Sequence, residues 1–434
     1  MASSSLGLAG PASMAQTPDS LDALFAFALA LAISYLVVPL TTRLAVRLDA
    51  IDRPNARSLH EQPTPKLGGL AILAGVLVAG LIWLPWDAES RAILGGAILI
   101  AAVGMIDDIY EIGAAPKLLG QTVAVIIPIS AGVKVEDFTF PFFGGLFPGS
   151  VDLVTLPWGS TVDLGDVGTV IAIVAACNMI NLIDGVDGLA AGVCAIAALT
   201  LAVIALSLDR NAAGVLAALV AGASLGFLRS GFPPATTFMG DTGSNLLGYL
   251  LGAVAVQGAL KTNAVVALFL PLIVLAVPIL DTGFVVAKRL KYRQPIYQAD
   301  TSHFHHRMAN IGFSQRRTLA YMYGWTLILA GLALALRFVP YSDDHGHFDA
   351  AWTAVILACG VFALGASIYL VYVLEILKLR RFRLRQLVGI RREAGRPAPA
   401  EAEVDRGVAQ ELQTGSFPAV DPETGEFEAI EKQS

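Results

Sequence analysis

Long apolar runs recur along almost the whole chain, and they constrain its fold more than any other feature. A helix needs roughly 17–25 predominantly apolar residues to cross a bilayer. Only 15% of the residues are charged, whereas a soluble domain usually carries about 25%. We therefore predict an all-α polytopic membrane protein with about eleven transmembrane helices. The predicted spans are residues 21–42, 68–86, 91–106, 116–132, 167–183, 189–207, 211–228, 244–260, 263–287, 317–337 and 351–377.

The basic residues predict the orientation of these spans. If the N-terminus lies outside and the loops alternate, most of the 29 Lys and Arg residues fall on the inner side, as the positive-inside rule requires. The C-terminus is then cytoplasmic, and residues 133–166 form an outer loop, which we expect to hold a short β-hairpin or extended cover. We divide the chain into a disordered N-terminus (1–18), a transmembrane domain (19–380), and a basic, then acidic, disordered tail (381–434).

A run of polar side chains closes the fifth predicted span. Asn178, Asn181 and Asp184 are spaced three residues apart, so they fall on adjacent parts of one helical face, and Asp187 follows. A polar helix cap with a glycine turn is the simpler interpretation, but a cap needs only one such residue. Polar groups at the end of an apolar helix are costly without partners. The run therefore predicts a polar, anionic site at the membrane face.

Carboxylates occur at two further span ends. The third predicted span ends in Asp107 and Asp108, with Glu111 on the same helical face, and Asp241 opens the eighth. Such a patch is either a plain acidic helix end or a site for Mg²⁺, which prefers oxygen ligands and often keeps substrate phosphates in its shell. A helix N-terminus also favours phosphate. We predict that Asp241 holds a metal ion that neutralises a phosphate.

Basic and aromatic residues of the inner loops are candidates for contacts with an anionic substrate. The basic loop residues equally suit simple positive-inside topology, and the aromatic one equally suits a buried anchor. Three histidines, His303, His305 and His306, form a cluster next to Arg307. For this cluster, a phosphate clamp is favoured over a zinc site, because a local His-only cluster lacks the usual ligand spacing. The candidates are Arg57, His60, Phe238, His303, His305, His306 and Arg307.

Five motifs together resemble the polyprenyl-phosphate N-acetylhexosamine-1-phosphate transferases, in glycosyltransferase family 4. They are residues 52–60 with 65–69, 107–108, 178–188, 238–244 and 303–307, in family order. The His-x-His-His-Arg motif is similar to that of the undecaprenyl-phosphate GlcNAc-1-phosphate transferases, whereas phospho-MurNAc-pentapeptide translocases carry three consecutive histidines. The sequence departs from the family pattern at Gly231, where Asn is expected, and at Ser58, where Lys is frequent.

The resemblance implies transfer of an N-acetylhexosamine-1-phosphate, foremost GlcNAc-1-phosphate, from a UDP-sugar to undecaprenyl phosphate. UMP is released, and the step would begin cell-wall or other cell-surface polysaccharide synthesis. Asp241 would bind Mg²⁺ or Mn²⁺. Asp107 or Asp108 would serve as a base or as a nucleophile, and the cluster His303, His305, His306 and Arg307 would stabilise charge. The substrates would be held by Asn178, Asn181, Asp184, Asp187, Phe238, Arg57 and His60.

The resemblance also implies partners and a location. The partners are a UDP-sugar, a polyprenyl phosphate and the lipid bilayer, with a possible homodimer and no nucleic acid. The protein is expected in the bacterial inner membrane with its site facing the cytoplasm. The alternatives are a pentapeptide-translocase activity, a transporter of lipids or nucleotide sugars, and a catalytically dead homologue. Every acidic residue of the motifs is present, which disfavours the last.

Overall fold

The structure is a computed structural model, and it forms two compact units. Residues 1–297 and 322–340 belong to the first, and residues 298–321 and 341–434 to the second. The described residues are 20–54, 62–135, 137–140, 145–148, 150–155, 157, 161–259, 265–291, 304, 307–308, 313–342, 347–393, 397–400 and 403–408. The N-terminus predicted to be disordered lies outside them.

Helices dominate both units, and each predicted span falls on one helix or, in one case, on a pair. The helices are α1 (Ser20–Arg47), α2 (Gly69–Trp83), α3 (Ala88–Tyr110), α4 (Ala114–Ser130), α5 (Leu164–Ile183), α6 (Leu189–Ser207), α7 (Asn211–Gly231), α8 (Gly240–Ala259), α9 (Val265–Val274), α10 (Ala276–Lys291), α12 (Gln315–Phe338) and α13 (Ala350–Glu393). Among the described residues, seven helices are long and apolar enough to cross a membrane, and three shorter ones are apolar. The predicted class, an all-α polytopic membrane protein, is confirmed.

The ninth predicted span, which contains Pro271 and Pro278, is broken. It forms α9 and α10, which are separated at Leu275. Pro278 has no amide hydrogen to donate to the carbonyl of Val274, so the helical hydrogen-bond ladder is interrupted there.

Small residues let the helices of the first unit approach closely. The helix α7 packs against α1 and α6. A Cβ added at Gly222 would lie 2.1 Å from the carbonyl oxygen of Phe27, and one at Gly226 would lie 2.3 Å from that of Leu31. Glycines four residues apart thus form the groove that receives α1, the arrangement by which small residues bring membrane helices together.

The helix α8 lies among other helices and contacts α3 and α5 most extensively. A Cβ at Gly104 of α3 would lie 2.5 Å from the carbonyl oxygen of Asp241, and one at Gly248 of α8 would lie 2.5 Å from the Cα of Cys177 in α5. These close approaches bring the C-terminal ends of α3 and α5 to the N-terminus of α8.

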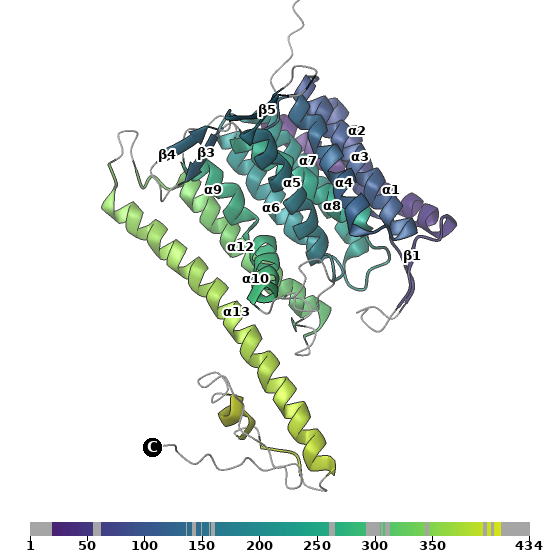
Figure 1. The fold of residues 1–434 in the computed structure, drawn as a ribbon, viewed down its shortest axis with the longest axis vertical. Coiled ribbons are helices and arrows are strands. Elements are labelled where there is room, and N and C mark those ends of the chain that lie inside the picture. Colours follow the sequence, from purple (N-terminus) through teal and green to yellow (C-terminus); the bar gives the residue numbers. More distant parts are fainter. Residues whose placement is uncertain are drawn as a thin grey trace, which may run out of the picture. The chain divides into compact units, whose positions relative to one another are not determined.

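Short antiparallel strand pairs occupy the two ends of the helical bundle. The pair β1 (Ile51–Asp52) and β2 (Thr64–Pro65) lies between α1 and α2. Between α4 and α5, where one hairpin was predicted, there are two: β3 (Asp137–Phe140) with β4 (Gly145–Pro148), and β5 (Asp152–Thr155) with β6 (Thr161–Asp163). Figure 1 shows β3, β4 and β5 at one end of the bundle and β1 at the other.

Loops from distant parts of the sequence meet at the β1 end. The amide of Phe238 donates to the carbonyl of Pro65, and the amide of Gly68 donates back to the carbonyl of Phe238. The loop before α8 is also tied to the loop after α5, because the amide of Ala235 donates to Asp187. The polar ends of α3, α5 and α8 therefore share one end of the bundle.

In the second unit, α13 is longer than the span predicted for it. It continues through the basic segment to Glu393, past residue 380, where we predicted the transmembrane domain to end, so residues 381–393 are helical. Residues 403–408 are also helical, and Val404 and Val408 are buried.

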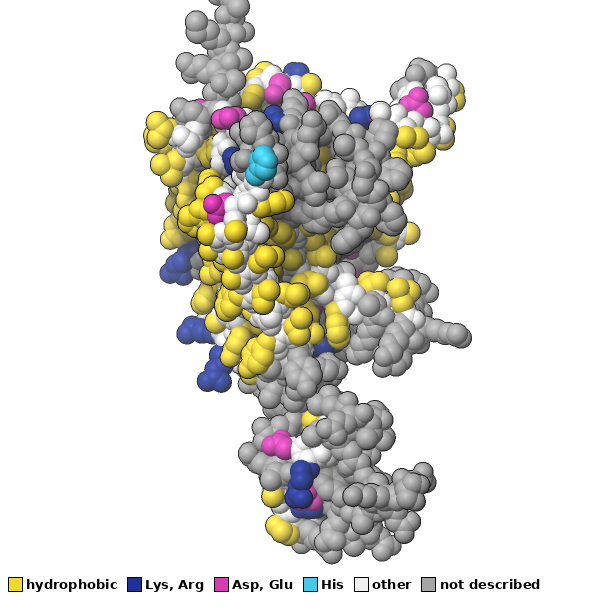
Figure 2. Space-filling view, turned by 90° about the vertical axis from the view of Figure 1, so that its left-hand side faces the viewer, with side chains coloured by type: hydrophobic (Ala, Val, Ile, Leu, Met, Phe, Trp, Pro, Cys, Tyr) yellow, Lys and Arg dark blue, Asp and Glu magenta, His cyan; other side chains and the backbone are white. Residues whose placement is uncertain are grey.

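Large apolar side chains are abundant on the surface of the described residues. They occur on α1, α3, α4 and the first part of α13, where Val361 and Tyr369 are 70% and 69% exposed. Figure 2 shows such side chains covering much of the helical surface that faces the viewer. Exposed apolar surface on this scale marks an interaction surface, and on helices of this length it is the surface expected to face lipid.

Candidate active site

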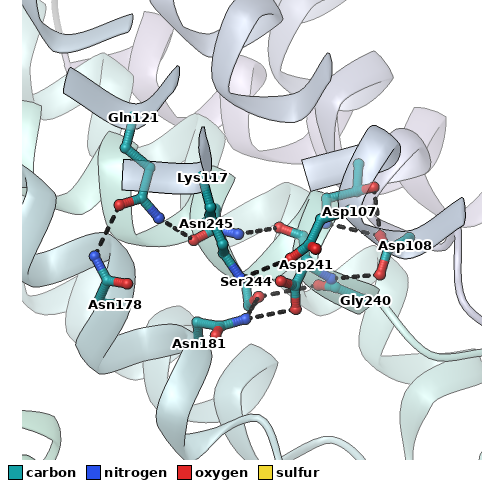
Figure 3. A network of polar contacts seen from close by, with 11 residues as sticks. Asp107, Asp108, Lys117, Gln121, Asn178, Asn181, Gly240, Asp241, Ser244 and Asn245 are labelled. Atoms are coloured by element: carbon teal, nitrogen blue, oxygen red, sulfur yellow. Dashed lines mark hydrogen bonds and ion pairs between the residues drawn. The ribbon is translucent and has the colours of Figure 1, made fainter. Parts of the chain in front are cut away.

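A lysine bridges two carboxylates at the β1 end of the bundle (Figure 3). The ammonium nitrogen of Lys117, in the first turn of α4, lies 3.0 Å from Asp107 Oδ2 at the end of α3 and also contacts Asp241 Oδ2 at the start of α8. The three side chains are only 14%, 12% and 27% exposed. Three helices thus meet through a partly buried ion-pair triad.

The carboxylate of Asp108 caps the N-terminus of α8. Its Oδ1 accepts from the amide of Asp241 at 2.8 Å, and its Oδ2 accepts from the amide and the hydroxyl of Thr242 at 2.9 and 2.7 Å. The first amides of a helix have no partner within it, so this carboxylate satisfies two of them. Gly240 allows the approach: its φ is +66°, and a Cβ there would lie 2.5 Å from Asp108.

Three side-chain amides form a chain of hydrogen bonds beside the ion-pair triad of Asp107, Lys117 and Asp241. Asn178 of α5 donates to Gln121 of α4 at 2.8 Å, Gln121 donates to Asn245 of α8 at 2.9 Å, and Asn245 donates to the carbonyl of Asp241 at 2.7 Å. Gln121 and Asn245 are buried. Since buried amides are high-energy unless paired, the chain fixes α4, α5 and α8 relative to one another.

Asn181 lies one turn after Asn178 and contacts Asp241 directly. Its amide nitrogen donates to Asp241 Oδ1 at 2.7 Å and to the hydroxyl of Ser244 at 2.9 Å. Asp241 therefore has one neutral donor on Oδ1 and the ammonium of Lys117 on Oδ2. The predicted helical face of α5 does point to the predicted carboxylates.

The loop after α5 is held from two further sides. Asp187 accepts from the amide of Ala235 at 3.0 Å, and the hydroxyl of Tyr323 in α12 donates to the carbonyl of Gly188 at 2.6 Å. Asp184 ends α5 and is half-buried. Phe238 is also half-buried on the loop that precedes α8.

The structure thus brings together most of the predicted carboxylates and amides. Glu111 does not join them, since α3 ends at Tyr110 and Glu111 takes a left-handed conformation with φ 49°; its side chain is 85% exposed and lies 3.9 Å from Lys66. Arg307 is buried in the second unit, 5.8 Å from the ring centre of Phe304. Five predicted residues lie outside the described ones: Arg57, His60, His303, His305 and His306.

Sequence reasoning missed Lys117, Gln121 and Asn245. The available signal was spacing: Lys117 and Gln121 are four residues apart in the first turns of an apolar helix, so they share one face. Asn245 is likewise four residues after Asp241. Charged and amide side chains inside predicted spans mark functional sites, and this rule indicates all three positions.

The residues of this site fit a divalent cation. Asp241 and Asp107 converge on one point, where their Oδ2 atoms share a single cation, the ammonium of Lys117. No group of three His, Cys, Asp or Glu side chains gathers within the described part of the chain. Mg²⁺ is commonly held by one or two carboxylates, with water and substrate phosphates completing its shell, so two carboxylates suffice.

The residues of this site lie in a part of the chain that matches a known protein family. Glycosyl transferase family 4 matches residues 90–259, which contain Asp107, Lys117, Asn181 and Asp241. A probable undecaprenyl-phosphate N-acetylglucosaminyl 1-phosphate transferase of Bacillus subtilis is 38% identical over 314 residues, 72% of this chain and 84% of its own length.

Two further relatives represent the two branches of the family, one each. A decaprenyl-phosphate N-acetylglucosaminephosphotransferase of Mycolicibacterium smegmatis is 33% identical over 339 residues, 71% of this chain and 80% of its own. A phospho-N-acetylmuramoyl-pentapeptide-transferase of Desulforudis audaxviator is 34% identical over 345 residues, 71% of this chain and 95% of its own. The chain therefore belongs to glycosyl transferase family 4, the polyprenyl-phosphate sugar-1-phosphate transferases, in the N-acetylglucosamine-1-phosphate branch.

Proposed function

We propose that the chain transfers N-acetylglucosamine-1-phosphate from UDP-GlcNAc to a polyprenyl phosphate, undecaprenyl phosphate in the first instance, and releases UMP. The site lies at the end of a membrane bundle, where a water-soluble nucleotide sugar and a lipid phosphate can meet. This step would begin the synthesis of a cell-surface polysaccharide.

The observation that carries this proposal is the group of Asp107, Lys117, Asn181 and Asp241 at the N-terminus of α8. Phosphoryl transfer depends mostly on positioning and on electrostatic stabilisation of the phosphate oxygens. An ammonium group, carboxylates able to hold a cation, and a helix N-terminus supply both. A transporter would instead place its ionisable residues near the middle of the bundle.

The observed contacts divide the roles of the paired aspartates. Both oxygens of Asp108 accept hydrogen bonds from α8, so we assign it to positioning Asp241. Asp107 contacts Lys117 and is the better candidate to act on the lipid phosphate, either as a base or as a nucleophile. Asp184, Asp187 and Phe238, on the loops beside α8, are proposed to hold the uridine diphosphate moiety.

Mg²⁺ or Mn²⁺ would be held by Asp241 with Asp107. When bound, such an ion neutralises pyrophosphate charge that would otherwise repel the carboxylates. The residues His303, His305, His306, Arg307, Arg57 and His60 remain candidates for further contacts with phosphate.

The basic residues support a position in the bacterial inner membrane with this end facing the cytoplasm and with about eleven spans. The predicted inner segments 43–67 and 288–317 and the tail from residue 378 hold most of the 29 Lys and Arg residues. A homodimer remains part of the proposal, and the mass of the purified complex in detergent tests it.

The decisive experiment measures UMP release by the purified full chain in detergent with UDP-GlcNAc, undecaprenyl phosphate and Mg²⁺. We expect lipid-dependent release that Asp241→Asn abolishes and Asp152→Asn preserves, because Asp152 is an exposed residue of β5, at the end of the bundle opposite to the N-terminus of α8 (Figure 1). Absence of UMP from folded wild-type protein with every UDP-sugar tested would contradict the proposal.

Two alternatives are separated by the same assay. The Desulforudis relative supports a pentapeptide-translocase activity, which predicts release with UDP-MurNAc-pentapeptide and none with UDP-GlcNAc. A transporter predicts that Asp241→Asn vesicles still exchange nucleotide sugar or lipid without releasing UMP.

A further inference from the structure

The ammonium of Lys117 stands where the two candidate metal-binding carboxylates converge. It contacts the Oδ2 atoms of both Asp107 and Asp241, and all three groups are largely shielded from water. Two carboxylates that lie close enough to share one ammonium group repel each other unless a cation lies between them. In the structure, the cation that these two carboxylates share is a side chain of the protein itself.

The position of Lys117 is set by the helix that carries it. Gln121 lies one turn further along α4, where it is fully buried and bonded to both Asn178 and Asn245. This fixes the rotation of α4 about its axis, and residues four apart share a face. The amide chain therefore directs Lys117 toward Asp107 and Asp241.

We propose that Lys117 is an internal counter-ion of the metal-free site, which a divalent cation must displace before it can bind. Metal and ammonium compete for the same carboxylate oxygens. The displaced ammonium, anchored beside the site by α4, is then free to pair with an oxygen of the incoming phosphate. The inference rests on the proposed metal role of Asp241 but does not require turnover.

If Lys117 competes with the metal, its removal should strengthen metal binding, whereas removal of a lysine that only binds substrate should not. Removing the ammonium leaves two partly buried carboxylates without their shared cation, and a divalent ion relieves that repulsion. The variant Lys117→Met should therefore bind metal more tightly than the wild type while transferring less sugar phosphate. Met keeps the unbranched shape of the side chain.

The test is titration of Mn²⁺ into the full chain in detergent, with free Mn²⁺ measured by electron paramagnetic resonance. We expect Lys117→Met to lower the Mn²⁺ dissociation constant about tenfold or more, since a hydrogen-bonded charge pair no longer has to be broken. Lys134→Met is the matched control. Lys134 also bridges two carboxylates, Asp163 and Asp166, but at the other end of the bundle, and its loss changes the net charge equally.

Each outcome decides the inference. An unchanged or weaker Mn²⁺ affinity in Lys117→Met overturns it, as does a gain of the same size in Lys134→Met or one that survives Asp241→Asn in the double variant. A larger rise in unfolding temperature on adding Mn²⁺ to Lys117→Met than to the wild type verifies that the variant is folded. Since Mn²⁺ binding is read without turnover, failure of the transferase activity leaves this comparison intact.

Discussion

Replacement of Asp108 by alanine removes the acceptor for three hydrogen bonds at the start of α8. The hydroxyl of Thr242 can turn to another acceptor, but the amides of Asp241 and Thr242 cannot. A buried amide left without a partner costs about 1–3 kcal/mol, and loss of a helix N-cap costs about 0.5–2 kcal/mol. We expect Asp108→Ala to lower the free energy of unfolding by about 3 kcal/mol, which corresponds to a fall in Tm on the order of 5 °C.

The chain carries its own reporters for this measurement. Cys177 in α5 and Cys194 in α6 are free and buried, so a thiol-reactive dye labels them only when the bundle opens. Cys359 is partly exposed, and a Cys359→Ala background removes its signal. UMP release should fall together with Tm, because Asp241 is itself one of the two residues that Asp108 caps.

Asp107→Ala is the matched control, because it removes the neighbouring carboxylate of α3 but leaves the amides of α8 capped. It should reduce UMP release while its Tm stays within about 2 °C of the wild type. Asp108→Asn keeps one acceptor oxygen and should fall between the two in Tm. An Asp108→Ala protein that unfolds at the wild-type temperature would refute the capping role.

Three further predictions follow from other contacts. Gln121→Leu breaks the amide chain and leaves Asn178 and Asn245 without their shared partner, so UMP release should fall about tenfold, whereas Gln257→Leu, near the other end of α8, should not change it. Tyr323→Phe removes the hydrogen bond to Gly188 and should destabilise the chain by about 1 kcal/mol and raise KM for the UDP-sugar; an unchanged KM would argue against a role for that loop in substrate binding. Hydrogen bonding to Asp163 raises the pKa of Lys134. Burial acts to raise the pKa of Asp163, but the hydrogen bonds from Lys134 and from the amide of Asp166 outweigh it and lower that pKa. The Tm difference between wild type and Lys134→Met should therefore be constant near neutral pH, shrink at alkaline pH as Lys134 deprotonates, and shrink at acid pH as Asp163 protonates; a difference independent of pH would show that the ion pair is unimportant.

Much of the fold was predictable because a bilayer imposes length and polarity on each span. Every predicted span coincides with a helix or, for α9 and α10, with a broken one. The glycine-rich α7 packs closely, and Asp241 stands at the start of α8. These features depend on local composition and spacing, which the sequence contains directly. The helix α13 continues past residue 380 to Glu393, because a helix extends while each next turn is locally favourable.

The sequence by itself determined the chemical groups of the site and the span ends on which they lie. Only the tertiary structure decided which of them touch. Asp107 and Asp108 are adjacent in the sequence, yet one contacts a lysine of α4 and the other caps α8, because consecutive helical residues point in directions about 100° apart. Lys117 and Gln121 joined the site only through the packing of α4 against α3 and α5, a long-range arrangement that is set by the fit of small residues between helices.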